Sequence, residues 1–152
     1  REQIDAAADA VREVAHGLSP RILSEQGLGP ALEELTAGLP VETDVSWEGR
    51  TGSGAPSPSD EASEDLYLIA SEAITNAMKH SGCSRIEVDV APRDGVVQLT
   101  VRDDGAGGAA PTGRGILSMA ARARRLGGTF ELVSPDGGPT TVTVRIPSGG
   151  PR

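Results

Sequence analysis

The chain has 152 residues and a formal net charge of −8, with 22 acidic against 14 basic side chains, so we expect one domain that does not bind nucleic acid. Its single cysteine, Cys83, excludes an internal disulfide and a multi-cysteine metal cluster, and it is typical of a reducing compartment such as the cytoplasm. No apolar run reaches the roughly 20 residues that a membrane-spanning helix needs, so we expect no membrane contact.

The N-terminal part of the chain is predicted to be helical. Residues 2–16 carry apolar side chains at spacings of three and four, which indicates an amphipathic helix that ends at Gly17. We interpret residues 18–23 as an ordered connection, because they contain Pro20. A second helix is predicted at 28–37, with glycine and proline residues closing its far end.

The middle of the chain combines a strand, a loop and a long helix. Residues 41–47 alternate between apolar and polar side chains, which predicts a half-buried strand. Residues 49–59 are rich in Gly, Pro and Ser and are interpreted as a loop. Residues 60–80 follow a helical pattern, and Gly82 stops it.

The C-terminal half is predicted to contain two hairpins separated by a loop and a helix. In chain order we expect strands at 86–90 and 97–101, a glycine-rich loop at 103–115, a helix at 116–126, and strands at 129–133 and 140–146. This order favours the α+β class. We predict a two-layer sandwich of a mixed β-sheet and three helices, preceded by N-terminal helices.

One polar face of the helix at 60–80 carries the groups of a magnesium–nucleotide site. Glu72, Asn76 and Lys79 fall on the same side at about 100° per residue. Asn76 offers a neutral oxygen to Mg²⁺, Glu72 can orient or deprotonate a group near a γ-phosphate, and Lys79 can neutralise phosphate charge. Taken alone, such a face is more simply the solvated side of an amphipathic helix.

Two glycine-rich turns further along favour the nucleotide. Asp103 follows an apolar strand and can accept a hydrogen bond from an exocyclic amine, while Gly105 and Gly107 let a planar base approach. The motif Gly113-Arg114-Gly115 precedes a helix whose first amides can meet phosphate oxygens. Each turn alone is common in a chain with 20 glycines, so the order of the segments carries the prediction.

In this order the segments resemble the N, G1 and G2 boxes of the GHKL ATPase superfamily, which includes sensor histidine kinases, gyrase B subunits, Hsp90 chaperones and MutL proteins. The similarity is to NarL/DesK-type histidine kinases, on the segments EAITNAMKHS (72–81), DDGAG (103–107), GRGILSM (113–119) and PTTVTVRIP (139–147). It covers about residues 41–147 and implies the Bergerat ATPase fold. Residues 16–32 also resemble the join between the second dimerisation helix and the catalytic domain of these kinases.

The resemblance implies a role for each matching residue, with ATP and Mg²⁺ as cofactors. Glu72 becomes the candidate base for phosphotransfer, and Asn76 becomes the magnesium ligand. The residues implied in ATP binding are Asn76, Lys79, His80, Asp103, Gly105, Gly107, Gly113, Arg114, Gly115 and Thr140. Asp103 is expected to bind the adenine amino group, and Thr140 is expected to support it through water, although Pro139 stands where the family has glycine. For His80 a helix-terminal role is an open alternative to phosphate contact.

The resemblance also divides the chain. Residues 1–22 correspond to a remnant of the second dimerisation helix and its connection, 23–147 to the catalytic domain, and 148–152 to a tail. We expect the phosphoacceptor histidine, which lies in the first dimerisation helix of the family, outside this sequence. His16 is interpreted as a helix C-terminal cap, so we do not expect this chain to phosphorylate itself.

We therefore predict the ATP-binding catalytic domain of a sensor histidine kinase. The domain is expected in the cytoplasm, and membrane anchoring of its parent protein is left open. Its expected partners are ATP, the dimerisation and phosphoacceptor domain of a homodimeric parent kinase, and the receiver domain of a response regulator. Two alternatives stay open: a serine kinase of the anti-sigma-factor type, and a nucleotide-binding interaction module without catalysis. Arg122, Arg124 and Arg125 are interpreted as the solvated outer face of the last helix, with a surface for an acidic receiver domain as the alternative.

Overall fold

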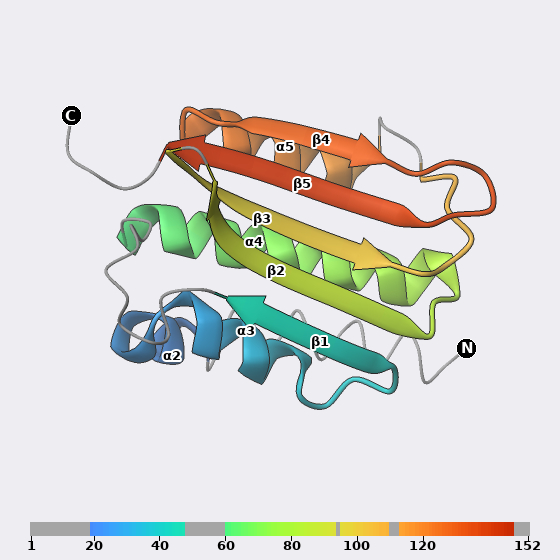
Figure 1. Ribbon diagram of the computed structural model, residues 1–152, viewed down its shortest axis with the longest axis horizontal. Helices are drawn as coiled ribbons and strands as arrows, with labels where there is room; N and C mark the ends of the chain where they lie inside the picture. The colour runs from blue at the N-terminus through green and yellow to red at the C-terminus, as the bar shows by residue number, and fades with distance from the viewer. Residues whose placement is uncertain (1–18, 48–59, 94, 110–112, 148–152) are drawn as a thin grey trace.

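Helices and strands are interspersed along the chain, as the predicted α+β class requires. The computed structural model describes residues 19–47, 60–93, 95–109 and 113–147. The elements are, in chain order, α2 (Ser19–Gln26), α3 (Leu28–Thr36), β1 (Glu42–Trp47), α4 (Asp60–Asn76), the π-helical turn η1 (Ala77–Ser81), β2 (Arg85–Arg93), β3 (Val96–Asp103), α5 (Arg114–Arg125), β4 (Thr129–Val133) and β5 (Thr140–Pro147). Figure 1 labels all of them except η1. The predicted helix at 2–16 with His16, the predicted loop at 49–59 and the predicted tail at 148–152 lie outside the described residues.

The strands form one mixed sheet of five strands in the order β1-β2-β3-β5-β4 (Figure 1). β1 pairs with β2 in parallel, and all other neighbours pair antiparallel. Parallel neighbours cannot be joined by a tight hairpin, so the chain leaves the sheet between β1 and β2. Helix α4 lies in this connection and is thereby carried across one face of the sheet.

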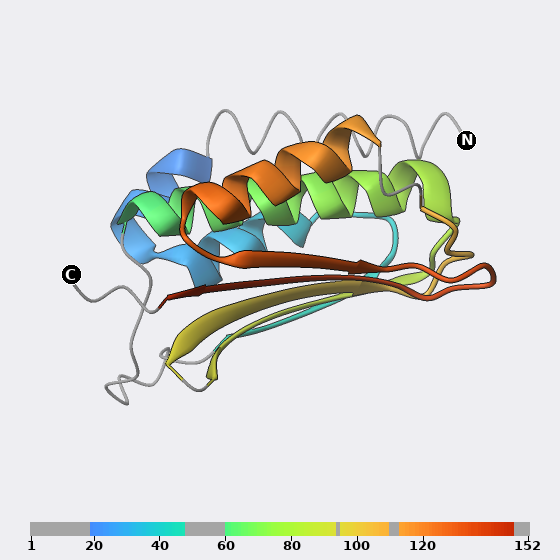
Figure 2. The ribbon, with the colours of Figure 1, turned by 90° about the horizontal axis from the view of Figure 1, so that it is seen from above.

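The described helices all cover the same face of the sheet, as Figure 2 shows from above. Successive side chains of a strand point to opposite faces, so each strand turns one apolar set toward the helices. The layers meet in a core whose most buried members include Leu66, Ile69, Ile74, Leu99 and Val144. The predicted two-layer sandwich is confirmed. None of the described helices is both long enough and apolar enough to cross a membrane.

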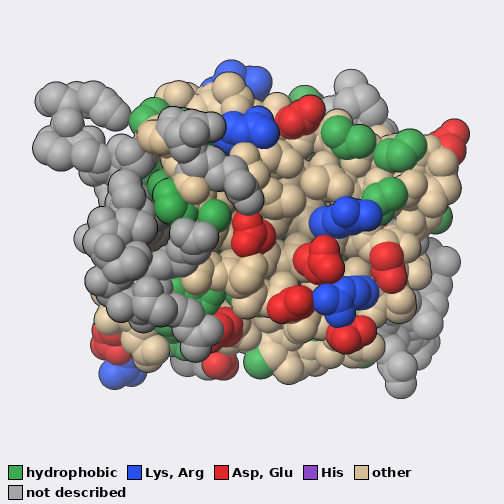
Figure 3. All heavy atoms as spheres, in the orientation of Figure 1, with side chains coloured by type: hydrophobic (Ala, Val, Ile, Leu, Met, Phe, Trp, Pro, Cys, Tyr) green, Lys and Arg blue, Asp and Glu red, His purple; other side chains and the backbone are tan. Residues whose placement is uncertain are grey.

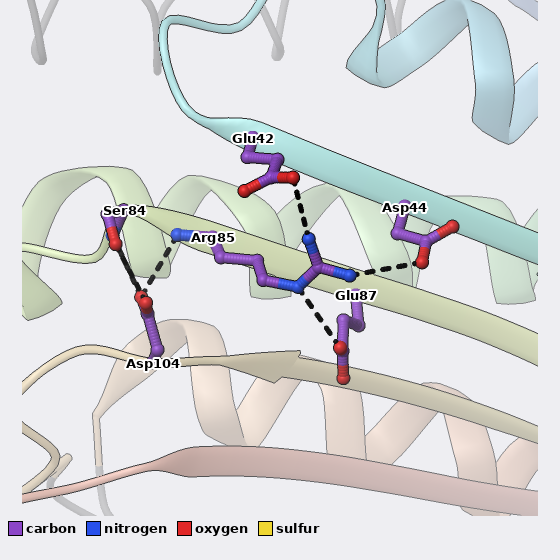
Figure 4. A network of polar contacts seen from close by, with 6 residues as sticks. All are labelled: Glu42, Asp44, Ser84, Arg85, Glu87 and Asp104. Atoms are coloured by element: carbon purple, nitrogen blue, oxygen red, sulfur yellow. Dashed lines mark hydrogen bonds and ion pairs between the residues drawn. The ribbon is translucent and has the colours of Figure 1, made fainter.

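The opposite face of the sheet carries charged side chains of both signs, which gather over β1 and β2 in Figure 3. At their centre the guanidinium of Arg85 forms ion pairs with the carboxylates of Glu42 at 3.0 Å, Asp44 at 3.1 Å and Glu87 at 3.2 Å (Figure 4). The hydrogen bond to Glu87 is the main cause that raises the pKa of Arg85 above its ordinary value. Charges along the edge strand β1 also disfavour its pairing with a further strand.

A second polar contact on this face joins the end of β3 to the start of β2. The carboxylate of Asp104 accepts hydrogen bonds from the backbone N–H of Ser84 at 2.8 Å, the Ser84 hydroxyl at 2.8 Å and the backbone N–H of Arg85 at 3.0 Å (Figure 4). These bonds favour the ionised form, so they lower the pKa of Asp104, with the Ser84 hydroxyl as the largest cause. The contact holds the chain in place next to Asp103.

The interpretation of residues 18–23 as a connection is wrong, because Ser19–Gln26 form helix α2. Pro20 is compatible with the first turn of a helix, where the missing N–H has no intrahelical partner. Gly27, with φ at 98°, separates α2 from α3. The predicted helix at 28–37 is confirmed as α3, and the expected boundary at residue 22 falls inside α2.

Candidate functional site

A cavity of about 770 Å³ lies where α4, α5 and the ends of β3 and β5 meet. Its size is within the range of about 300–1,000 Å³ that is common for small-molecule sites. Most residues of the sequence motifs lie on its wall, namely Glu72, Asn76, Lys79, Asp103, Gly107, Gly113, Arg114, Gly115 and Thr140. Gly105 is not part of the wall, and the side chain of His80 lies outside the described residues. The fold thus brings together motifs that are far apart in the sequence.

The polar face of α4 forms one side of the cavity. Glu72 and Asn76 are both partly buried, and Lys79 follows them on the same wall. The helix predicted at 60–80 is α-helical only to Asn76, since Ala77–Ser81 form a π-helical turn that ends at Gly82 with φ at 65°. The thiol of Cys83 donates to the carbonyl oxygen of Ala77 at 3.7 Å and contributes to closing this wider turn. Single π-helical turns are frequent at functional sites, and this one directly follows Asn76.

The first turn of α5 forms the facing side. A Cβ atom at Gly115 would overlap the Glu72 carboxylate and would lie 3.3 Å from the side-chain nitrogen of Asn76. A side chain at position 115 would therefore have to displace the end of the Glu72 side chain. Gly113, the N-cap residue, makes no side-chain cap hydrogen bond, so the first amides of α5 are available to an anion. A carboxylate, an amide and a helix N-terminus then surround the same space, which suits the phosphates and cation of a nucleotide.

The other end of the cavity contains Asp103 and Thr140, which are register partners on β3 and β5. Asp103 is only 5% exposed, and its carboxylate accepts a hydrogen bond from the backbone N–H of Gly105 at 2.8 Å. Gly105 thus orients the carboxylate from outside the wall. Asp103 keeps acceptor capacity for a ligand, because an ionised carboxylate offers several lone pairs.

The apolar part of the wall was not predicted from the motifs. It contains Ile116 and Met119 of α5, and Leu132 and Val142, which are register partners on β4 and β5. Such side chains suit the faces of a planar base. The signal was present in the alternation of the last two strands, since Leu132 and Val142 belong to the sets that point toward the helices.

An ion-pair cluster lies beside the cavity, between α4 and the C-terminal half of α5. The side chain of Asp65 is 5% exposed, and one of its oxygens accepts from Arg122 at 3.0 Å and also from Arg125. The interpretation of Arg122 as a solvated outer-face residue is therefore wrong, because a buried carboxylate on α4 pairs with it. Arg125 pairs with the same carboxylate but its side chain is still 60% exposed. Arg124 is exposed, as expected.

Two contacts thus join α4 to α5, one at each end of α5. Asp65 meets Arg122, and Glu72 meets Gly115. Asp65 and Glu72 are as far apart in the sequence as Gly115 and Arg122. The two contacts therefore lie at matching positions along the antiparallel helices.

Known proteins share this fold and these motifs. Residues 61–150 match the family described as "Histidine kinase-, DNA gyrase B-, and HSP90-like ATPase". The match spans more than half of the chain. The chain belongs to this ATPase family. Membership of this family implies that the chain binds ATP.

Curated relatives of this family member are sensor kinases. The chain is 29% identical over 158 residues to the sensor histidine kinase MctS of Rhizobium johnstonii, a match that covers 99% of the chain and 34% of the relative. It is 36% identical over 154 residues to the nitrate/nitrite sensor protein NarX of Escherichia coli, with 95% and 25% covered. The chain spans about a third or less of the length of these relatives.

Solved structures confirm the fold. The histidine kinase domain of the blue-light activated kinase EL346 from Erythrobacter litoralis superposes with a TM-score of 0.61 at 19% identity, covering 80% of this chain and 65% of that one. The ATP binding domain of PrrB from Mycobacterium tuberculosis gives a TM-score of 0.56 at 24% identity, with 81% and 92% covered. The predicted fold of GHKL ATPases is thereby confirmed.

Proposed function

We propose that this chain is the catalytic domain of a sensor histidine kinase. It would bind Mg-ATP and present the γ-phosphate to a histidine on the dimerisation domain of its parent, for transfer to the receiver domain of a response regulator. The observation that carries the proposal is the approach of Gly115 to Glu72 and Asn76, because it places a helix N-terminus opposite a carboxylate and an amide. The named sensor kinases among the relatives support the same reading.

Each end of the cavity suits one part of the nucleotide. Asp103 can accept from the adenine amino group, and Thr140 lies opposite Asp103 in the sheet register. The apolar side chains of α5, β4 and β5 that line the cavity would contact the faces of the base in this arrangement. At the other end, Lys79 and Arg114 can neutralise phosphate charge, which the overall charge of −8 makes necessary.

The residues around Gly115 fit a magnesium ion. Mg²⁺ prefers oxygen ligands and is commonly held by one or two protein side chains together with substrate phosphates. Within the described residues no group of three or more His, Cys, Asp and Glu side chains is arranged to hold a metal alone. Asn76 would therefore hold the ion jointly with the nucleotide, and the bound ion would offset the charge of the phosphates.

Glu72 would act in the transfer itself. Phosphoryl transfer depends mainly on positioning and electrostatic stabilisation, so a site with few ionisable groups is sufficient. The Glu72 carboxylate lies beside the first turn of α5, where it would orient or deprotonate the incoming imidazole. The acceptor histidine would come from the dimerisation domain, to which residues 1–22 would connect the catalytic domain at 23–147. Such a kinase would work in the cytoplasm, where Mg-ATP is available.

Calorimetric titration with Mg-ATP tests the binding part of the proposal. The wild-type chain should bind Mg-ATP, and Asn76→Ala should weaken binding at least tenfold, about the size of one charge-assisted contact. Gln98→Ala is the matched control, because it also removes an amide but lies on the open face of the sheet at the β3–β5 pair. Equal binding by wild type and Asn76→Ala would contradict the assignment of Asn76.

A transfer assay tests the catalytic part. A separately produced dimerisation domain that carries the acceptor histidine should become labelled from [γ-³²P]ATP, and the label should be acid-labile as expected for phosphohistidine. Glu72→Gln should retain nucleotide binding and lose transfer. An acid-stable label on a serine of an added protein would favour the anti-sigma-factor type instead. Binding without transfer to any added acceptor would favour the non-catalytic module.

A further inference from the structure

The hairpin between β4 and β5 packs against the loop that follows Asp103. The backbone N–H of Gly137 donates to the carbonyl of Ala106 at 2.7 Å, and the N–H of Gly108 donates to the carbonyl of Ser134 at 3.0 Å. A Cβ atom at Gly107 would collide with the carbonyl oxygen of Pro135. The two segments therefore form one packed unit at the base end of the cavity.

Ser134 makes the side-chain contacts within this unit. Its hydroxyl accepts from the backbone N–H of Ala109 at 2.9 Å and lies 2.7 Å from the hydroxyl of Thr140. Ala109 and Thr140 are both on the cavity wall, whereas Ser134 is behind it. Ser134, which is not on the wall, thus contacts two wall residues, Ala109 and Thr140, through its hydroxyl oxygen.

The direction of the Ser134–Thr140 hydrogen bond decides what Thr140 offers to a ligand. A hydroxyl has one proton to donate and two lone pairs to accept with. The Ala109 N–H occupies one lone pair of Ser134, so Ser134 has its proton and one further lone pair for Thr140, and either hydroxyl can be the donor. In one of the two arrangements Ser134 donates to Thr140. The proton of Thr140 is then available to the cavity, beside the acceptor Asp103.

An acceptor next to a donor is complementary to adenine. The adenine edge offers an exocyclic amine that donates and a ring nitrogen, N1, that accepts. Hypoxanthine has the opposite pattern, with a carbonyl at position 6 and a proton on N1. Asp103 and a Thr140 hydroxyl that donates, directly or through a water, therefore match adenine and oppose hypoxanthine.

We propose that Ser134 is a positioning residue for base selection, which holds Thr140 as a donor toward the cavity and so favours adenine over 6-oxopurine nucleotides. The inference rests on the binding of ATP in this cavity. It assigns no contact between Ser134 and the nucleotide, since the residue acts through Thr140.

Titration of wild type, Ser134→Ala and Ser134→Thr with ATP and with inosine triphosphate tests the inference. Ser134→Ala should lower the affinity for ATP about tenfold, the size of one hydrogen bond, and leave the affinity for inosine triphosphate nearly unchanged. Ser134→Thr retains the hydroxyl and should restore the preference. If Ser134→Ala does not fold, Ser134→Cys, which has the same shape and a weaker donor, gives the same reading.

A double-mutant cycle with Thr140→Val supplies the second readout. Ser134→Ala should have no further effect on ATP affinity once Thr140 is valine, because the two residues act in sequence. A parallel loss for ATP and inosine triphosphate, or additive effects in the cycle, would overturn the inference and leave the ATP site intact. Failure of the wild type to bind ATP would overturn the proposed function itself.

Discussion

Gly115 packs directly against Glu72, so closely that a side chain at position 115 would lie 3.0 Å from the Glu72 carboxylate carbon even before its own hydrogens are counted. The contact brings the first turn of α5 against helix α4, which contains the first part of the N box, at the wall of the cavity. It links a structural requirement, the absence of a Cβ atom, to a chemical one, the position of a carboxylate at the phosphate end.

Gly115→Ala is expected to displace Glu72 and Asn76 and to lower the affinity for Mg-ATP about tenfold or more. Alanine is favoured over glycine in helices by up to about 1 kcal/mol, and this gain offsets the cost of moving the Glu72 side chain. The free energy of unfolding should therefore change little. Calorimetry and urea denaturation measure the two effects. Gly38→Ala is the control, because a Cβ atom there meets nothing within 4 Å. Unchanged binding by Gly115→Ala would show that α4 and α5 can separate without affecting the site.

Arg122→Ala is expected to lower the free energy of unfolding by about 1–3 kcal/mol, because the buried Asp65 carboxylate loses a hydrogen-bond donor. One oxygen of Asp65 already has no hydrogen-bond partner, so the carboxylate has little capacity to compensate. Urea denaturation measures the loss.

Arg124→Ala is the matched control, since Arg124 is exposed on the same helix, and its effect should stay within about 0.5 kcal/mol. Adding Asp65→Ala to Arg122→Ala should cost little more, because the buried carboxylate, which then has only Arg125 as a donor, is removed. If Arg122→Ala and Arg124→Ala lowered the free energy of unfolding equally, the ion pair between Asp65 and Arg122 would not contribute to stability.

Asp104 should make part of the stability depend on pH. Its pKa is lowered in the folded state, so its contribution is present above the unfolded pKa of about 3.9 and is lost as the pH falls through the folded pKa. The difference in unfolding free energy between wild type and Asp104→Asn should therefore shrink on acidification, which urea denaturation between pH 7 and pH 3 measures. Ser84→Ala should weaken the same pH dependence, since the Ser84 hydroxyl is its largest cause. A difference that is constant over this pH range would contradict the assignment.

Gly29→Ala is expected to destabilise the contact between α3 and β1. A Cβ atom at Gly29 would overlap the indole of Trp47, and such overpacking typically costs about 1–3 kcal/mol. Trp47 is the only tryptophan, so its fluorescence reports both the local change and unfolding. Trp47→Leu in the same chain should relieve the clash, and a Gly29→Ala variant as stable as the wild type would disprove it.

Local sequence patterns predicted the helices and strands and the side chains that share one face of them. The helical period placed Glu72, Asn76 and Lys79 on one face, and Asp103 was expected at the end of an apolar strand, where the structure has it. The alternation of strands predicted the mixed sheet, although not its order. The predicted roles of these residues stay predictions until binding and transfer are measured.

The remaining features depend on tertiary contacts that no local pattern records. Ser134 is one polar residue in a turn, and its importance follows only from its contacts with Ala109 and Thr140. Asp65 and Arg122 are far apart in the sequence, so each resembles an ordinary solvated charge until the helices pack. The π-helical turn at Ala77–Ser81 leaves the helical composition unchanged, and a regular helix was therefore expected there.

The matched spacing of the two α4–α5 contacts has a consequence for inhibitor design. We expect a compound that separates Asp65 from Arg122 to loosen the packing of α5 on α4. The contact between Gly115 and Glu72 lies about 10 Å further along the helices, at 1.5 Å per residue, and would be weakened with it. Such a compound would weaken nucleotide binding without resembling ATP. Cellular ATP would compete with it only through the coupling of the two helix ends, because the compound would not occupy the nucleotide pocket.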